Sequence, residues 1–406
     1  MRIKPFIAWR PPVNLAAQVA SPPYDVVDTE EARAMAAGQP SCFLHVNRAE
    51  IDLPVGTDLY ADEVYRQAQK NFKTFQDQGY LVKDSRPALY VYRLVMGTHS
   101  QTGVVVVCHV EDYERDIVKK HEKTRKNAED DRTRYTSLVN ANLGPVFLAY
   151  KDQARIDELI RNVQQSAPLF DFTAVDGIRH SIWPVPDSAE LVRQFAAVPE
   201  AYIADGHHRA ASAARVAIER RAANPRHTGE EEYNWFLAVL FPATQLQILP
   251  YNRCVRDLNG LSAAQFLGAV RERFAVAENA APRPMRPTQV SMYLEGKWYG
   301  LSWTPEADAN PVAALDVSVL QDRVLAPLLG IDDPRSNKRI EFVGGIRGTD
   351  ELKKRVDEGR SAVAFSMYPT TIDQLMAIAD AGAVMPPKST WFEPKLRSGL
   401  LVHVLE

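Results

Sequence analysis

Residues 202–214 are the part of this chain whose residue types and spacing could do chemistry. The apolar residues up to Ala204 predict a strand, Asp205-Gly206 predicts a sharp turn, and the alanine-rich run after Arg209 predicts a helix. Free N–H groups and the positive end of the helix dipole favour an anion at such a turn. The segment therefore predicts a phosphate-binding turn that is formed by Gly206, His207, His208 and Arg209. Asp205 is placed to contact a metal ion or a proton.

Two simpler interpretations of this turn stay open. Asp205 could be an N-capping residue, and the basic residues after it could form a solvated first turn. A zinc centre is disfavoured, because the adjacent side chains of His207 and His208 leave a helix roughly 100° apart. Other phosphate-binding patterns, such as GxxxxGK[ST] or GxGxxG after a strand, do not occur in the sequence.

A second polar cluster is the charged run at residues 119–124. Glu122 lies between cationic residues that favour its ionised form, so it could serve as a general base while the lysines attract a polyanion. The alternative is a solvated charged loop. On sequence alone both interpretations are retained.

The third cluster is the proline-framed loop at residues 386–395. Prolines restrict such a loop before any ligand binds, which is how a binding loop is pre-organised. Lys388 and Ser389 could bind a phosphate, and an ordinary packed surface loop is the equal alternative. The Tyr251-Asn252-Arg253 run is a weaker signal of the same kind.

Composition limits the classes of protein to which the chain can belong. It has 406 residues, of which 46% are hydrophobic, and a formal net charge of −3, which gives no general attraction to nucleic acid or anionic membranes. Three separated cysteines without CxxC spacing indicate buried thiols in a reducing compartment. No apolar run approaches the ~20 residues of a membrane span. We therefore expect a soluble, cytoplasmic protein with no nucleic-acid or membrane partner, and its oligomeric state stays open.

The order of predicted elements indicates an α+β fold of mixed sheets. Helices are predicted at residues 60–78, 130–140, 262–275 and 371–382, and hairpins at 88–110, 170–185 and 290–303, the second around Asp176-Gly177. Hairpins mixed with isolated helices argue against a regular doubly wound sheet. Three prolines within residues 282–287 suggest a linker, so we expect an N-terminal α+β region at 1–281 and a C-terminal α+β subdomain at 288–406. The 386–395 loop of that subdomain could return to the site.

Several separated motifs resemble those of a bacterial and archaeal family, the domain of unknown function 1015. The resemblance extends over nearly the whole chain. It is carried by SPPYDV at 21–26, FLHV at 43–46, HEKT at 121–124, NLGPVF at 142–147, ADGHHR at 204–209, and the loop from Pro387 to Lys395.

The DGHHRxxxA element also resembles the ParB/sulfiredoxin-like superfamily, whose members include partition proteins, sulfiredoxins and archaeal free-serine kinases. This resemblance implies a nucleotide-binding core around the strand, turn and helix. By analogy with the serine kinases, Glu122 would be the catalytic base and residues 205–209 would form the phosphate and metal turn. His121 or Lys388 would neutralise the departing phosphate, and Thr124 and Arg253 would contact the acceptor.

The resulting hypothesis is a small-molecule kinase that phosphorylates the hydroxyl of free L-serine, with Mg²⁺ as cofactor and ATP or ADP as donor. A nucleotide-binding regulatory protein and a phosphoester hydrolase are the alternatives. A DNA-partitioning role is disfavoured, since there is no helix-turn-helix signature and the chain is slightly acidic. A sulfiredoxin-like reductase would need a reactive cysteine at the turn, and Cys254 lies outside it.

Overall fold

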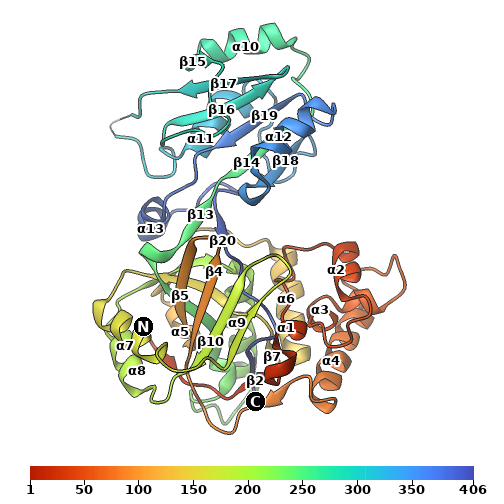
Figure 1. The fold of residues 1–406 in the computed structure, drawn as a ribbon, viewed down its shortest axis with the longest axis vertical. Coiled ribbons are helices and arrows are strands. Elements are labelled where there is room, and N and C mark those ends of the chain that lie inside the picture. The colour runs from red at the N-terminus through yellow and green to blue at the C-terminus, as the bar shows by residue number, and fades with distance from the viewer. Residues whose placement is uncertain (307) are drawn as a thin grey trace. The chain divides into compact units, whose positions relative to one another are not determined.

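The computed structural model describes residues 1–306 and 308–406, which form two compact units. The first, called here the N-terminal unit, contains residues 1–246 and 394–406. The second, called here the inserted unit, contains residues 247–393. The chain thus leaves the N-terminal unit after Leu246 and re-enters it at Pro394, a path that can be followed by colour in Figure 1.

The N-terminal unit is built on a nine-stranded mixed sheet. Its strand order is β6-β11-β8-β12-β5-β4-β10-β9, with β1 paired to β5. The β11–β6 and β12–β8 pairs are parallel and the others are antiparallel. The strands are β1 (Ile3–Lys4), β4 (Tyr90–Met96), β5 (His99–His109), β6 (Val118–Lys119), β8 (Val146–Tyr150), β9 (Phe170–Thr173), β10 (Arg179–Pro184), β11 (Ala201–Asp205) and β12 (Trp235–Pro242).

Both faces of this sheet are covered at its centre. Val104 to Cys108 in β5 are all buried, the pattern of a strand with packed layers on both sides. Gly103 permits a close approach to β12, since a Cβ there would lie 2.6 Å from the Leu240 carbonyl oxygen. The covering helices are α5 (Val110–Glu114), α6 (Lys126–Val139), α7 (Ala154–Val163), α8 (Ala189–Ala196) and α9 (His207–Ala223).

A smaller layer of the same unit combines short helices with a four-stranded antiparallel sheet. Its core packs Phe43, Tyr65, Phe72 and Phe75 against Tyr135 of α6. The sheet order is β3-β2-β21-β7. The elements are β2 (Ala8–Arg10), α1 (Ala16–Val19), α2 (Thr29–Ala36), α3 (Leu44–Asn47), α4 (Asp62–Asp77), β3 (Val82–Lys83), β7 (Ala141–Asn142) and β21 (Val402–Val404).

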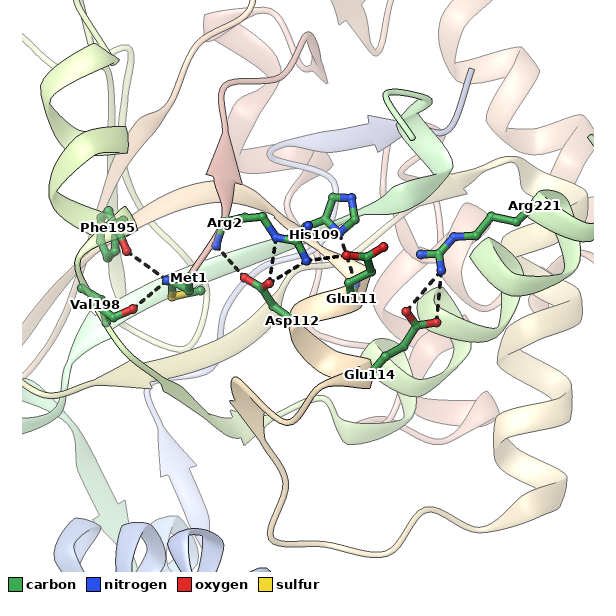
Figure 2. Close-up of polar contacts among 9 residues, drawn as sticks. All are labelled: Met1, Arg2, His109, Glu111, Asp112, Glu114, Phe195, Val198 and Arg221. Atoms are coloured by element: carbon green, nitrogen blue, oxygen red, sulfur yellow. Dashed lines mark hydrogen bonds and ion pairs between the residues drawn. The ribbon is translucent and has the colours of Figure 1, made fainter. Parts of the chain in front are cut away.

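Helix α9, which carries most of the predicted phosphate turn, is anchored at its far end by the ionic contacts drawn in Figure 2. Arg221 lies 3.2 Å from Glu114 at the end of α5. At the start of α5, the Arg2 side chain contacts Glu111 at 2.9 Å and the buried Asp112 at 2.9 Å. Arg2, α5 and the C-terminal end of α9 are therefore tied together, which fixes the helix whose first turn forms the predicted site.

The inserted unit is a six-stranded antiparallel sheet with helices. Its strand order is β15-β17-β16-β19-β14-β18, and β13 pairs separately with β20. The strands are β13 (Gln247–Leu249), β14 (Tyr251–Val255), β15 (Ala275–Glu278), β16 (Gln289–Leu294), β17 (Lys297–Ser302), β18 (Ile340–Gly344), β19 (Val363–Met367) and β20 (Trp391–Glu393). The helices are α10 (Ala263–Arg271), α11 (Asp316–Leu320), α12 (Gly348–Asp357) and α13 (Ile372–Asp380), and a π-helical turn at 321–325 continues α11.

The α+β class predicted from the sequence is confirmed, but the structure divides the chain elsewhere. Residues 282–287 join β15 to β16, which both belong to the sheet of the inserted unit. The proline-rich run is therefore a loop within one unit and not a linker at the end of an N-terminal region 1–281. Within the described residues, no helix has the length and apolar character needed to cross a membrane.

Candidate functional site

The predicted strand, turn and helix are present as β11, Gly206 and α9. Gly206 is the N-cap and has φ +97°, a left-handed conformation that favours glycine. A Cβ at this position would lie 3.0 Å from Nε and Cζ of Arg209, whose side chain folds back over the turn. No side chain caps this helix, so the alternative interpretation of Asp205 as an N-capping residue is wrong.

The Asp205 carboxylate is instead held by two cations. Its Oδ2 lies 3.2 Å from Nη2 of Arg209 and 3.5 Å from Nζ of Lys395, which is just past the point where the chain re-enters this unit. Burial alone would raise the pKa of Asp205, but Lys395 and then Arg209 hold it well below its ordinary value. Asp205 is therefore ionised at neutral pH. Lys395, the last residue of the 386–395 segment, belongs to the N-terminal unit, and we did not predict it as a site residue.

The Arg209 guanidinium is largely buried and already has partners. Its Nη1 donates to the Pro145 carbonyl oxygen, and its Nη2 lies 4.0 Å from the Asp25 carboxylate as well as close to Asp205. Burial would lower the pKa of this guanidinium, but the two carboxylates outweigh burial and raise it. Its Nε is buried without a hydrogen-bond partner among the described residues. The side chain is thus fixed at the turn with one donor unused.

Two buried histidines join the turn to the predicted base loop. The rings of His121 and His207 pack edge to face with centroids 4.4 Å apart, and the His121 backbone N–H faces Nε2 of His207 at 3.4 Å. Burial lowers the pKa of His121 to about 4 and that of His207 well below its ordinary value. Both rings are neutral at neutral pH. This argues against the predicted role of His121 in neutralising a departing phosphate.

Glu122 lies at the surface beside these rings. Its Oε2 is 3.8 Å from Nδ1 of His207, and 53% of its side chain is exposed. Because Nε2 of the neutral His207 ring faces a backbone donor, we assign the ring proton to Nδ1, where it faces the Glu122 carboxylate. The predicted base and the predicted phosphate turn therefore lie side by side.

His208 and Thr124 hold the loop in place. Nε2 of His208 accepts a hydrogen bond from the Arg125 backbone N–H at 3.1 Å. The Thr124 hydroxyl donates to the Glu129 carboxylate at 2.8 Å. Both side chains therefore fasten residues 124–125 to neighbouring helices, which positions Glu122 rather than presenting new donors to a ligand.

A cleft of about 500 Å³ is linked to the turn through two of its lining residues, Asp25, which lies 4.0 Å from Arg209, and Arg125, whose backbone N–H donates to His208. It combines carboxylates, guanidinium groups and apolar side chains. The Arg132 guanidinium stacks on the Tyr24 ring at 4.2 Å, at the junction with a smaller cavity of about 50 Å³ that Arg209 also lines. The cleft is lined by Tyr24, Asp25, Val26, Val27, Asp28, Arg48, Glu50, Leu59, Tyr60, Val64, Arg125, Ala128, Asp131 and Arg132.

The remaining predicted site residues belong to the inserted unit. Nη2 of Arg253 donates to the Lys388 carbonyl oxygen at 3.1 Å. Ser389 is buried, and its hydroxyl donates to the Pro386 carbonyl oxygen at 2.7 Å. The Ser389 hydroxyl is therefore used within its own loop, and Arg253 is bonded to the Lys388 backbone of that loop.

The turn offers hard oxygen ligands but no complete metal cage. No group of three or more histidine, cysteine, aspartate or glutamate side chains suited to a metal ion occurs in the described residues. Asp205 and Asp25 both lie within 4.0 Å of the same Arg209 nitrogen. One or two carboxylates are what a Mg²⁺ ion needs from a protein when phosphate oxygens supply further ligands. This donor set fits the predicted metal role of Asp205.

Comparison with models of protein families assigns the chain to one family. The model of the family described as protein of unknown function (DUF1015) matches residues 3–318. The chain belongs to this family. The match contains the turn, the base loop and Asp25 but ends before Lys395, and no curated protein matches the chain.

Solved structures give a distant likeness. A free serine kinase in complex with AMP is 13% identical, with 71% of this chain and 86% of that chain covered and a TM-score of 0.37. A conserved hypothetical protein from Pyrococcus furiosus is 14% identical, with 74% and 95% covered and a TM-score of 0.38. SbnI with a C-terminal truncation, from Staphylococcus aureus, is 12% identical, with 74% and 87% covered and a TM-score of 0.39. Scores this low carry no argument about mechanism.

Proposed function

We propose that this protein is a nucleotide-dependent phosphotransferase that acts on the hydroxyl of a small molecule, most concretely free L-serine. The observation that carries the proposal is the contact between two segments that are far apart in the sequence. The Glu122 carboxylate lies 3.8 Å from His207, the first residue after the glycine of the anion-binding turn. A candidate base thus lies beside a candidate phosphate site, which is the arrangement that phosphoryl transfer needs.

The step can be written on these residues. The acceptor oxygen forms a bond to the transferred phosphorus, the bond from phosphorus to the nucleotide oxygen breaks, and the hydroxyl proton passes to the Glu122 carboxylate. His207 stays neutral, and its Nδ1–H faces that carboxylate at 3.8 Å. The first turn of α9 and the Lys395 ammonium favour the negative charge of the transferred group.

Nucleotide and metal would lie at the border of the turn and the 500 Å³ cleft. Arg125 and Arg132 line that cleft and supply cations for a phosphate tail, while its apolar side chains suit a base or a ribose. Asp205 and Asp25 would hold Mg²⁺, which when bound neutralises phosphate charge. Before a ligand binds, the positive charges of Lys395 and Arg209 balance the negative charges of Asp205 and Asp25.

Serine as the acceptor rests on the resemblance of residues 205–209 to the turn of the free-serine kinases. ATP and ADP remain equal candidates for the donor. Phosphoester hydrolysis is the second candidate function, since Glu122 is 53% exposed and could deprotonate a water molecule as readily as a hydroxyl.

Product analysis tests the proposal. Purified full-length protein is incubated with Mg²⁺, ATP or ADP, and a panel of amino acids and polyols, and phosphorylated products are identified by mass spectrometry. We expect O-phosphoserine from one of the two donors. Release of inorganic phosphate without any phosphorylated acceptor would replace the kinase with the hydrolase, and no turnover of either nucleotide would refute both.

The Glu122→Gln substitution tests the base. We expect transfer to fall by roughly 10²- to 10⁴-fold while nucleotide binding is retained, because the amide keeps the shape but cannot take the proton. Glu158→Gln is the matched control, since Glu158 is also a surface glutamate of the N-terminal unit with 52% of its side chain exposed. Transfer that survives in Glu122→Gln would show that another group accepts the proton.

A further inference from the structure

The inserted unit contains a second cavity, of about 290 Å³, whose lining includes the buried side chain of Arg253. We propose that this cavity binds a small organic anion whose carboxylate or phosphate group pairs with Arg253 while its apolar part packs on the walls. Every lining residue belongs to the inserted unit, so the proposal does not rest on the transfer reaction. The apolar walls are Val317, Leu325, Phe342, Pro386 and Pro387.

Arg253 is a buried cation without an anionic partner. It is 3% exposed, and no carboxylate within the described residues forms an ion pair with it. Its guanidinium donates to the carbonyl oxygens of Tyr251 and Lys388 and lies 5.5 Å from the centre of the Phe342 ring. Carbonyl oxygens and a ring face offer only partial charges. Burial accordingly lowers the pKa of Arg253 to about 10.

Another arginine of the same unit shows the usual arrangement. Arg355, with 14% of its side chain exposed, lies 2.7 Å from Glu341 and 2.6 Å from Glu351. Desolvating a charge without such a counter-ion is costly, and an entering anion would remove that cost. Arg253 therefore differs from Arg355 in having no carboxylate partner among the described residues.

The wall beside Arg253 is built before any ligand enters. Lys388 has φ +58°, which is uncommon for a residue with a side chain, and its carbonyl oxygen accepts from Arg253. The Ser389 hydroxyl donates to Pro386, and the Thr370 hydroxyl donates to the Ser389 carbonyl oxygen at 3.0 Å. Two prolines and these bonds hold the loop, so little conformational entropy is lost on binding.

The volume of the cavity and the charges of its lining residues define the ligand class. A volume of about 290 Å³ is at the lower end of small-molecule pockets, roughly 300–1,000 Å³, and suits a short organic acid. Two carboxylates also line the cavity: Asp333, which is paired with Arg335 at 2.9 Å, and Asp332, which is exposed. These carboxylates disfavour ligands with several negative charges and favour a single carboxylate or phosphate group.

Calorimetric titration of the full-length protein without nucleotide tests the site, with acetate, butyrate, hexanoate and inorganic phosphate as probes. We expect the affinity for carboxylates to rise about fourfold per methylene group until the cavity is filled, as burial of apolar surface predicts. Butyramide should bind at least tenfold more weakly than butyrate, since it has the same shape without the charge. Equal binding of acid and amide, or no binding of any of these anions, would overturn the proposal.

Two further measurements locate the ligand. Arg253→Gln should lose at least tenfold in butyrate affinity, whereas Arg256→Gln, which removes an exposed arginine next to the same strand, should change nothing. Should Arg253→Gln not fold, hydrogen exchange on the wild type decides, with protection by butyrate expected at residues 251–255 and 388–390. Protection confined to other segments, or unchanged affinity in a folded Arg253→Gln protein, would refute the assignment.

Discussion

Replacing Gly206 with alanine tests whether the turn holds Arg209 in its observed place. The backbone at Gly206 has φ +97°, so any L-residue there costs roughly 1–2 kcal/mol in the left-handed region. The new Cβ would also lie 3.0 Å from two atoms of the Arg209 guanidinium, closer than ordinary van der Waals contact. Arg209 must then move by a few tenths of an ångström, away from its 3.2 Å contact with Asp205.

Gly229→Ala is the matched control in the same unit. Gly229 also has φ +97°, but a Cβ added there would meet no atom within 4 Å. Both variants therefore place an L-residue at the same positive φ, and the difference between them reports mainly the displacement of Arg209. Hydrogen bonds to charged groups contribute about 1.5–3 kcal/mol, and partial loss of the Asp205 contact should cost about 1 kcal/mol.

Urea unfolding of the two variants and the wild type measures this difference. We expect Gly206→Ala to lose about 1 kcal/mol more free energy of unfolding than Gly229→Ala. We also expect nucleotide affinity to fall about tenfold in Gly206→Ala alone, because the cationic side of the turn has shifted. Equal destabilisation by the two substitutions, together with unchanged nucleotide binding, would refute the idea that the glycine is needed to seat Arg209.

Two further predictions concern the charges around the turn. The pKa of His121 in the folded protein is lowered from 6.5 to about 4, so the unfolded chain binds a proton before the folded one does. The free energy of unfolding therefore falls as the pH drops from 6.5 to 4, by about 3 kcal/mol at most for this residue. Unfolding at pH 7 and pH 4.5 should show a smaller loss in His121→Phe, and an equal loss would contradict the assignment. Lys395→Met should cost about 2 kcal/mol at pH 7, and this cost should shrink as the pH falls below 3.8 toward the lowered folded-state pKa of Asp205, where the folded carboxylate takes up its proton. Lys73→Met is the exposed control.

The elements predicted correctly are those with local signals. The Asp176-Gly177 turn predicted the β9–β10 hairpin, and the hydrophobic spacing at 60–78 predicted α4. Thr371 begins α13 with a capping box, which is again a property of neighbouring residues. In contrast, β18 was missed because its strand character comes from pairing with β14, far away in the sequence. Sheet order depends on such long-range contacts, which a single sequence does not display.

The same distinction between local and long-range signals explains which residues of the candidate site could be predicted from the sequence. The turn at residues 205–209 could be predicted because its anion-binding property comes from local backbone geometry. Only resemblance joined the roles of Glu122 and residues 205–209, and their contact through His207 was not predicted, since a sequence does not show which loop covers which helix. The carboxylate of Asp25 and the ammonium of Lys395 were not assigned to the site at all. The sequence alone does not show which charged residues will pair in the folded chain.

The loop at residues 386–395 shows why proximity in sequence is a poor guide to shared function here. Gln247 and Glu393 are paired residues of β13 and β20, so the two places where the chain crosses between the units are fastened together. Everything before that pair, including Pro386 and Lys388, is fixed within the inserted unit by its own hydrogen bonds. Lys395, two residues after it, serves Asp205 in the N-terminal unit. One short motif therefore supplies Pro386 to a cavity of the inserted unit and Lys395 to the turn of the N-terminal unit, and the β13–β20 pair lies between them in the sequence.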